Sequence, residues 1–329
     1  MSILPYTEGH SKTVYSLVWP ETEQVVRQSL SDVERLLERH RRPHLKQQDA
    51  IGPDFAAIWW EWSGIGSGSV HQWENFYPTA GASEPIREVI DELSAKNGIL
   101  VVFDGEYEGY AAIAQGHNTP VQVINRSNWK EEWKALQHLL NTGVLNNAQW
   151  WISEPSAING CVWDGFDEFV TTVSADPRVE LWVDATYIGA TVSPRAYSVI
   201  SSKYITGVVF SLSKPFGVYY RRIGGCFSRR PVKNLWGNMW FKNIDSIELG
   251  KLLLTAQSNT SLASKYQSEQ TRVLSQWNTN QTNVWHASDV VLLAYATSRP
   301  DVEIDERYRR GDFYRVCLTP AMHKLINGV

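Results

Sequence analysis

Residues 208–225 read Val-Val-Phe-Ser-Leu-Ser-Lys-Pro-Phe-Gly-Val-Tyr-Tyr-Arg-Arg-Ile-Gly-Gly, and this stretch is the most informative part of the chain. Val208–Phe210 is an apolar run typical of a buried strand, and it is followed by a serine and then Lys214 in a turn that contains a glycine. Two adjacent arginines precede the next apolar run. Taken alone, such a lysine is most often a surface residue, so the neighbouring segments decide whether Lys214 has a chemical role.

Short apolar runs alternate with helical patterns on the N-terminal side of this stretch. The expected strands are Phe55–Trp62, Ile99–Phe103, Val121–Ile124, Gln149–Ile152, Val179–Val183, Gly207–Leu212 and Ile223–Phe227. The expected helices are a segment with Ser83 as its N-cap and Gly98 at its end, then Trp129–Leu140 and Gly165–Val173. Strand and helix repeated in this way predict an α/β fold, with a mostly parallel sheet and helices on both faces.

The two ends of the chain have a different pattern. Residues 20–42 favour a helix that ends in a basic run before Pro43. After residue 235 the pattern is mainly helical, at Ile244–Ala256 and Thr260–Trp277, with late strands at Val302–Ile304 and Tyr314–Leu318. We therefore expect a large domain over 51–235 and a small α+β domain built from residues 236–329 and part of 1–50.

Composition narrows the class of protein. The chain has 329 residues, 43% of them apolar, 20% charged, and a formal net charge of −4, which is typical of a globular protein and lacks the basic excess of a nucleic-acid binder. The three cysteines, Cys161, Cys226 and Cys317, are widely spaced and favour a reducing compartment. The N-terminus lacks a signal-peptide pattern, and no apolar stretch reaches 18 residues. We expect a soluble, cytoplasmic enzyme without membrane segments.

Four further segments place polar residues at the ends of predicted strands or at a helix start. They are Leu181–Tyr187, with an aspartate and a tyrosine three residues later; the small-residue turn Thr79–Ser83; Phe103–Tyr110; and Phe313–Leu318. In their order, type and approximate spacing, these segments and the lysine block resemble fold-type I pyridoxal-phosphate (PLP) enzymes, the aspartate aminotransferase-like class I/II group. The resemblance covers roughly residues 75–225 and the Arg315 segment.

The resemblance implies roles for the central residues. Lys214 would form a Schiff base with the cofactor aldehyde and later carry the proton between substrate Cα and cofactor C4′. Asp184 would lie against the pyridine nitrogen and keep the ring protonated, and Tyr187 would hydrogen-bond the phenolic oxygen. Tyr107 would stack on the ring, and Arg315 would bind the substrate α-carboxylate through two parallel hydrogen bonds.

A phosphate requires hydrogen-bond donors. Gly81, Ala82 and Ser83 lie at a predicted helix N-terminus, where free N–H groups and the helix dipole favour an anion. In the resembling family, a serine before the lysine and an arginine eight residues after it complete the phosphate site. Ser211 and Arg222 match these positions, and Arg221 is the competing choice.

One segment departs from the family pattern. Where the family carries an asparagine-proline-threonine-glycine turn, whose asparagine contacts the phenolic oxygen, this chain reads Ser153-Glu154-Pro155-Ser156-Ala157-Ile158-Asn159-Gly160. A gapless match puts Ala157 at the asparagine position. Either Asn159 supplies the contact from a reshaped turn, or the contact is absent.

Other readings of single motifs stay open. Ser211 and Lys214 also fit the S-x-x-K motif of penicillin-binding serine hydrolases, although neither S-D-N nor K-T-G follows. Gly64–Ser69 suggests the loop of a nucleotide-binding oxidoreductase, with G-x-G-x-G instead of G-x-G-x-x-G. No H-E-x-x-H or C-x-x-C occurs, so we expect no metal. The tryptophans at 59, 60, 62, 73, 236 and 240 fit core and interface packing, or an apolar wall of a substrate pocket.

Together these patterns predict a PLP-dependent aminotransferase of amino acid metabolism or biosynthesis. It would act as a homodimer on an amino acid and a keto acid. A lyase, decarboxylase, cyclase or racemase on the same fold is the alternative, because the outcome depends on which Cα bond stands perpendicular to the cofactor ring.

Overall fold

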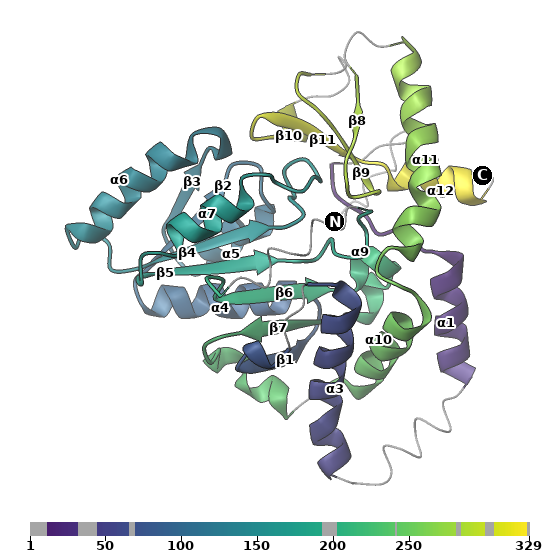
Figure 1. Cartoon of the computed structure of the whole chain (residues 1–329), viewed down its shortest axis with the longest axis horizontal. Helices are drawn as coiled ribbons and strands as arrows, with labels where there is room; N and C mark the ends of the chain where they lie inside the picture. Colours follow the sequence, from purple (N-terminus) through teal and green to yellow (C-terminus); the bar gives the residue numbers. More distant parts are fainter. Residues whose placement is uncertain are drawn as a thin grey trace.

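A computed structural model describes residues 12–31, 45–65, 70–192, 203–240, 242–280, 284–299 and 306–327. Its centre is a seven-stranded sheet, with strand order β1-β7-β6-β5-β4-β2-β3 (Figure 1). The strands are β1 (Asn75–Thr79), β2 (Ile99–Phe103), β3 (Val121–Ile124), β4 (Ala148–Ser153), β5 (Val179–Asp184), β6 (Gly207–Ser211) and β7 (Gly224–Ser228). The pairs between β6 and β3 are all parallel, whereas β7 pairs antiparallel with both β6 and β1. The expected α/β fold with a mostly parallel sheet is confirmed.

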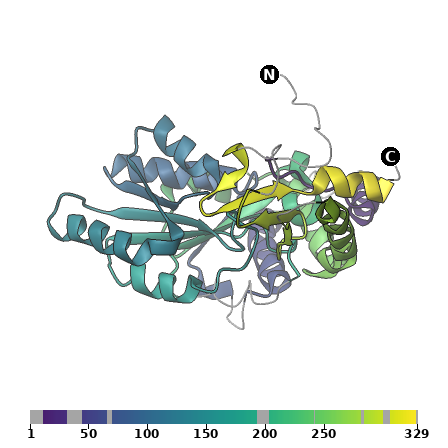
Figure 2. The ribbon, with the colours of Figure 1, turned by 90° about the horizontal axis from the view of Figure 1, so that it is seen from above.

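The central strands of this sheet are buried because helices cover both faces (Figure 2). Helices α4 (Ser83–Ala95) and α5 (Glu108–Gly116) pack on the face that carries Leu100, Trp151 and Trp182. Helices α3 (Leu45–Ser63), α6 (Trp129–Asn141) and α7 (Phe166–Val173) contribute to the other cluster, together with Val101, Trp150 and Leu181. Neighbouring residues of one strand thus face opposite layers, which is why these strands read as continuous apolar runs.

The expectation of a strand at Phe55–Trp62 is wrong, because these residues form the second half of helix α3. The apolar run fits a buried strand and a buried helix equally well, because a helix that is buried on most of its surface shows no clear helical periodicity. Trp59 stacks on Phe210 of β6, with ring centroids 3.9 Å apart and planes at 14°. The edge strand β1 was missed, because Asn75 and Pro78 are unfavourable strand residues.

A second, antiparallel sheet has the order β10-β11-β9-β8 and lies beside the C-terminal helices (Figure 1). Its strands are β8 (His286–Ala287), β9 (Leu293–Ala296), β10 (Arg309–Arg310) and β11 (Phe313–Cys317). The remaining α-helices are α1 (Pro20–Ser31), α9 (Ser213–Phe216), α10 (Ile244–Ala256), α11 (Ser261–Trp277) and α12 (Thr319–Asn327). The helices expected at 244–256 and 260–277 are therefore confirmed, and the strand expected at 314–318 corresponds to β11.

Some expectations lie outside the described residues, namely the basic run before Pro43, most of the loop Gly64–Ser69 and the strand at Val302–Ile304. The domain boundaries at residues 50 and 235 stay a prediction. None of the helices that the structure describes combines the length and apolar content that a bilayer crossing needs.

Candidate functional site

A cavity of about 340 Å³ lies where the parallel strands of the large sheet end. Ser153, Asp184 and Ser211 are the last residues of β4, β5 and β6, and all three line the cavity. The small sheet closes another side through Arg310 and Arg315. Ligands bind at the carboxyl ends of strands in open α/β sheets, because helix N-termini and loop side chains meet there.

The cavity brings together most of the residues expected from the sequence. The predicted residues among those lining it are Ala82, Ser83, Tyr107, Asp184, Tyr187, Ser211, Lys214, Arg222 and Arg315. Gly81 does not line it, but a Cβ at Gly81 would contact the side chains of Arg222 and Ser211, which do. Asn159 is not among the lining residues that the structure describes.

Lys214 lies in the single-turn helix α9 at the end of β6, and the left-handed Gly217, with φ +71°, ends that turn. Its Nζ donates a hydrogen bond to the carbonyl oxygen of Val14. Burial, with a smaller contribution from the Arg315 guanidinium, lowers the pKa of Lys214 to about 8, whereas Cys317 and Asp184 oppose the shift. A buried amine with this pKa is neutral for a large share of the time near pH 8, and a neutral amine is the nucleophilic form.

The carboxylate of Asp184 is held rigidly at the end of β5. Its Oδ2 accepts a hydrogen bond from the Tyr110 hydroxyl at 3.0 Å, and its Oδ1 accepts from the backbone N–H of Thr186 at 3.0 Å and from the Thr186 hydroxyl. Burial raises the pKa of Asp184, while the hydrogen bonds from Thr186 and Tyr110 oppose the rise. Such a carboxylate is suited to pairing with a cationic ring nitrogen.

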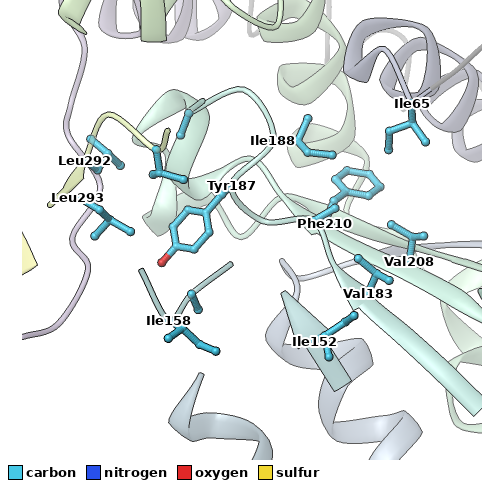
Figure 3. Close-up of a cluster of buried hydrophobic side chains, with 14 of the residues drawn as sticks. Ile65, Ile152, Ile158, Val183, Tyr187, Ile188, Val208, Phe210, Leu292 and Leu293 are labelled. Carbon is cyan, nitrogen blue, oxygen red and sulfur yellow. The ribbon is translucent and has the colours of Figure 1, made fainter. Parts of the chain in front are cut away.

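Two tyrosines contribute differently to the cavity. Burial raises the pKa of Tyr187 to about 12, and Arg315 opposes that shift, so its hydroxyl is a hydrogen-bond donor at neutral pH. Its ring belongs to the same buried cluster as Ile158 and Leu293 (Figure 3). Tyr107 precedes helix α5, lines the cavity and is 47% exposed.

An anion cradle, defined here as Gly81, Ser83, Ser211 and Arg222, forms at the start of α4. Gly81 has φ +78°, and a Cβ there would lie 3.0 Å from Arg222 Nη2 and 3.4 Å from Ser211 Oγ. The space that a Cβ would fill is thus lined by a guanidinium, a hydroxyl and the N-terminus of a 13-residue helix. These donors fit a phosphate monoester, so the residues present are compatible with the phosphate of PLP.

Ser83 is not the N-cap that the sequence predicted. Ala82 takes that position, and no side chain caps the helix. Ser83 is the first residue of α4 and lines the cavity. The Glu84 carboxylate accepts a hydrogen bond from the backbone N–H of Ala80 instead, at 2.5 Å. The Ser83 side chain does not cap the helix and instead hydrogen-bonds the side chain of Tyr107, another residue that lines the cavity.

Arg315 enters the cavity from β11 and is only 6% exposed. Its Nη2 donates to the carbonyl oxygen of Lys12 at 3.2 Å, and its Nη1 donates to the carbonyl oxygen of Ala157. Its Nε is buried without a hydrogen-bond partner among the described residues. A guanidinium with spare donors in a buried wall can bind a carboxylate through two parallel hydrogen bonds.

The turn after β4 places Asn159 away from the cavity. Its Oδ1 accepts a hydrogen bond from the backbone N–H of Cys161 at 3.1 Å. Ala157, by contrast, lines the cavity with its methyl group. A ligand contact from Asn159 therefore stays a prediction that this geometry does not favour.

Several cavity residues escaped the sequence analysis. Thr186 and Tyr110 hold Asp184; Ser213 shares a 2.9 Å hydroxyl contact with Ser211; and Glu106, Lys12 and Arg310 line the wall. The aspartate followed two residues later by threonine is a signal that could have identified Thr186, because aspartate often accepts the N–H two residues on. Glu106 carries no such signal, since a lone glutamate in a loop is usually solvated.

The tryptophans favour the packing interpretation. Trp59, Trp60 and Trp73 are buried in the core, whereas Trp236 and Trp240 are exposed with ring centroids 6.0 Å apart. None of the six clustered tryptophans, all of which the structure describes, lines the cavity. Within the described ranges, no group of three or more His, Cys, Asp or Glu side chains is placed to hold a metal ion.

Comparison with known proteins defines the fold. No family model and no curated sequence matches the chain. Among solved structures, it is similar to the PLP-bound C-S lyase from Staphylococcus hominis, with a TM-score of 0.68 and 12% identity over 96% of this chain and 88% of that one. It is also similar to the histidinol-phosphate aminotransferase from Clostridium acetobutylicum, with a TM-score of 0.62 and 12% identity over 97% of this chain and 98% of that one. It is similar as well to L-threonine-O-3-phosphate decarboxylase from Porphyromonas gingivalis, with a TM-score of 0.62 and 13% identity over 96% of this chain and 99% of that one. The chain thus has the fold of fold-type I PLP-dependent enzymes, as the sequence motifs indicated.

Proposed function

We propose that the protein is a PLP-dependent aminotransferase that acts on an amino acid and a keto acid. The observation that carries this proposal is a single cavity lined by a half-buried lysine with a lowered pKa, a buried aspartate and an anion cradle. The sheet order supports it, because β5, which carries Asp184, lies beside β6, which leads to Lys214. The fold shared with PLP-bound enzymes supports the same cofactor.

Different cavity residues would contact different parts of the cofactor. The anion cradle would bind the phosphate, with the backbone at Ala82 and the hydroxyl of Ser213 adding donors. Lys214 would attach to the aldehyde carbon through Nζ, Tyr107 would cover one face of the ring, and Tyr187 would donate to the phenolic oxygen. Arg221 is the less suitable phosphate ligand, because Arg222 lines the cavity and Arg221 does not appear among the described lining residues.

Bound PLP supplies an electron sink that makes the bonds to the substrate Cα easier to break. Asp184 would keep the proton on the pyridine nitrogen, because a buried carboxylate next to that atom stabilises its cationic form. Arg315 would bind the α-carboxylate and so fix the orientation of Cα. Lys214 Nζ would carry the proton between substrate Cα and cofactor C4′, which its lowered pKa allows near neutral pH.

We place the reaction in the cytoplasm and in a homodimer with small-molecule partners. All three cysteines are free thiols, which suits a reducing compartment. Tyr219 lines the cavity and is 55% exposed, so the mouth of the cavity offers apolar surface that a second copy would cover.

Covalent labelling tests this proposal directly. The purified protein with added PLP should absorb at roughly 410–430 nm, and borohydride should fix the cofactor to the chain. Peptide mapping should then find the label on Lys214, and Lys214→Arg should abolish it. A label on another lysine, or no absorbance band, would contradict the proposal.

A lyase, decarboxylase, cyclase or racemase is the second candidate, because the chain shares its fold with a C-S lyase and a decarboxylase as well as with an aminotransferase. Product analysis separates these chemistries. Transamination converts an added keto acid into its amino acid, a lyase releases ammonia and a keto acid without an acceptor, and a decarboxylase releases carbon dioxide.

A further inference from the structure

Glu106 is a buried carboxyl group in the cavity wall that the reaction outlined above does not use. It follows β2, is 7% exposed and lines the cavity together with Ser153, Ala157 and Asp184. Its Oε1 accepts a hydrogen bond from the backbone N–H of Ser153 at 3.2 Å, and its Oε2 accepts from the Ser153 hydroxyl at 2.5 Å. A carboxyl group held so firmly at a cavity wall can present its remaining lone pair or proton to a ligand.

The sheet order places Glu106 on one particular side of Asp184. The anion cradle belongs to β1, β7 and β6, which lie on one side of β5. Glu106 and Ser153 belong to β2 and β4, which lie on the other side. Asp184 ends the strand between these two groups.

The substituents of the cofactor ring are arranged in a matching order. On the pyridine ring, the phosphate arm and the phenolic oxygen flank the aldehyde carbon on opposite sides. If the phosphate lies in the cradle and the ring nitrogen faces Asp184, the phenolic oxygen points toward the β4–β2 side. On that side Ala157 offers only a methyl group, and Asn159 is engaged with Cys161.

We propose that Glu106 is the residue that hydrogen-bonds the phenolic oxygen of the cofactor, together with Tyr187, in place of a side chain from the turn after β4. This inference rests on the proposed function, because it presumes that PLP occupies the cavity. The contact would come from the loop after β2.

The charges around Glu106 suit this role. Burial raises the pKa of Glu106 to about 7; the Ser153 hydrogen bonds and Arg126 oppose the rise, and Asp184 adds to it. The other ionisable groups that act on the same region are Glu154, Tyr110 and Tyr187. Burial also raises the pKa of Glu154 well above its usual range, which disfavours a second negative charge beside Glu106. Glu106 is therefore partly protonated near pH 7 and can donate to an anionic oxygen.

The first experiment titrates the visible absorbance band of the holoenzyme with pH. Glu106→Gln removes the negative charge that the carboxyl group carries above pH 7, so the chromophore should hold its proton about tenfold less tightly, a fall of about one pH unit in the midpoint. Glu154→Gln is the matched control, because Glu154 is a buried carboxyl in the same cluster that does not line the cavity. Its midpoint should equal that of the wild type.

The second experiment compares PLP with its 3-deoxy analogue, which lacks the phenolic oxygen. Glu106→Ala should weaken the binding of PLP about tenfold, because a charge-assisted hydrogen bond is lost. The same variant should bind the analogue as tightly as the wild type does. A merely structural role would weaken the binding of both ligands equally and would overturn the inference.

The outcomes separate the two proposals. If the wild type forms no visible band with PLP, the proposed function fails. If the wild type forms the band but Glu106→Gln leaves its midpoint unchanged, only the inference about Glu106 fails. If Asn159→Ala shifts the midpoint and Glu106→Gln does not, the contact belongs to Asn159 and the inference is overturned.

Discussion

Replacing Gly81 with alanine tests whether the anion cradle binds the cofactor phosphate. Gly81 has φ +78°, and the added Cβ would lie 3.0 Å from Arg222 Nη2. That nitrogen is held in place by a 2.7 Å hydrogen bond to the carbonyl oxygen of Ala80. The guanidinium must therefore move, and the Cβ would fill space that the proposed cradle offers to the phosphate.

Two effects contribute to the expected magnitude. The left-handed backbone costs alanine ~1–2 kcal/mol, which lowers the stability of the protein with or without cofactor. Losing one charge-assisted hydrogen bond to the phosphate costs ~1.5–3 kcal/mol, so the cofactor should bind roughly 10- to 150-fold more weakly.

Gly143→Ala is the matched control. Gly143 has φ +72°, but a Cβ there would meet no heavy atom within 4 Å. This variant should show the same loss of stability in urea unfolding and an unchanged dissociation constant for PLP, measured by absorbance titration of the apoprotein. If Gly81→Ala also bound PLP as tightly as the wild type, the phosphate would not lie in the cradle.

Three further predictions follow from the same geometry. Arg315→Lys should keep the yellow colour of the bound cofactor, but it should lose ~2–5 kcal/mol of transition-state binding because lysine lacks the two-donor fork. That loss is a fall of roughly 30-fold to several thousand-fold in kcat/KM. An unchanged kcat/KM would mean that another group, such as Arg299, holds the substrate. Burial raises the pKa of Glu106 to about 7 from 4.5, so the folded apoprotein binds the extra proton between these values and stability should fall as pH rises through 7. Relative to Glu106→Gln, the wild type should lose up to ~3 kcal/mol of unfolding free energy between pH 5 and 8, and parallel pH curves for the two proteins would refute the shift. Sedimentation should find a homodimer whose activity falls on dilution; a monomer of full activity would rule out a site that depends on the dimer.

Local pattern was enough to predict those elements and site residues that lie on or next to regular, buried strands. Asp184, Ser211 and Lys214 stand at or just after apolar runs, and parallel strands bring their carboxyl ends to one edge, so their meeting was predictable. The runs at 99–103 and 179–183 were recognisable because these central strands are buried on both faces, whereas the edge strand at 121–124 was recognisable from its β-branched residues alone.

Other features were decided only by tertiary packing. The run Phe55–Trp62 is helical because its aromatic rings pack on Phe210 and Phe227 of the neighbouring strands, which a local pattern does not show. Ser83 is not a cap, because the helix begins one residue earlier than predicted: Ala82 is the N-cap and its carbonyl oxygen accepts from the N–H of Ile86. Packing and backbone hydrogen bonding thus outweighed local side-chain preference in these two cases.

Glu106 is a cavity residue that the local sequence did not reveal. Its sequence neighbours suggest an ordinary solvated loop, and only the parallel pairing of β2 with β4 brings it to the Ser153 hydroxyl. The resulting burial changes its protonation, since desolvation disfavours the charged form whatever the local sequence. The sequence by itself thus determined the fold class and the lysine–aspartate pair, because these follow from apolar periodicity and strand ends. The tertiary structure alone decided which further side chains face the cavity, because burial and hydrogen bonding depend on residues that are far apart in the chain.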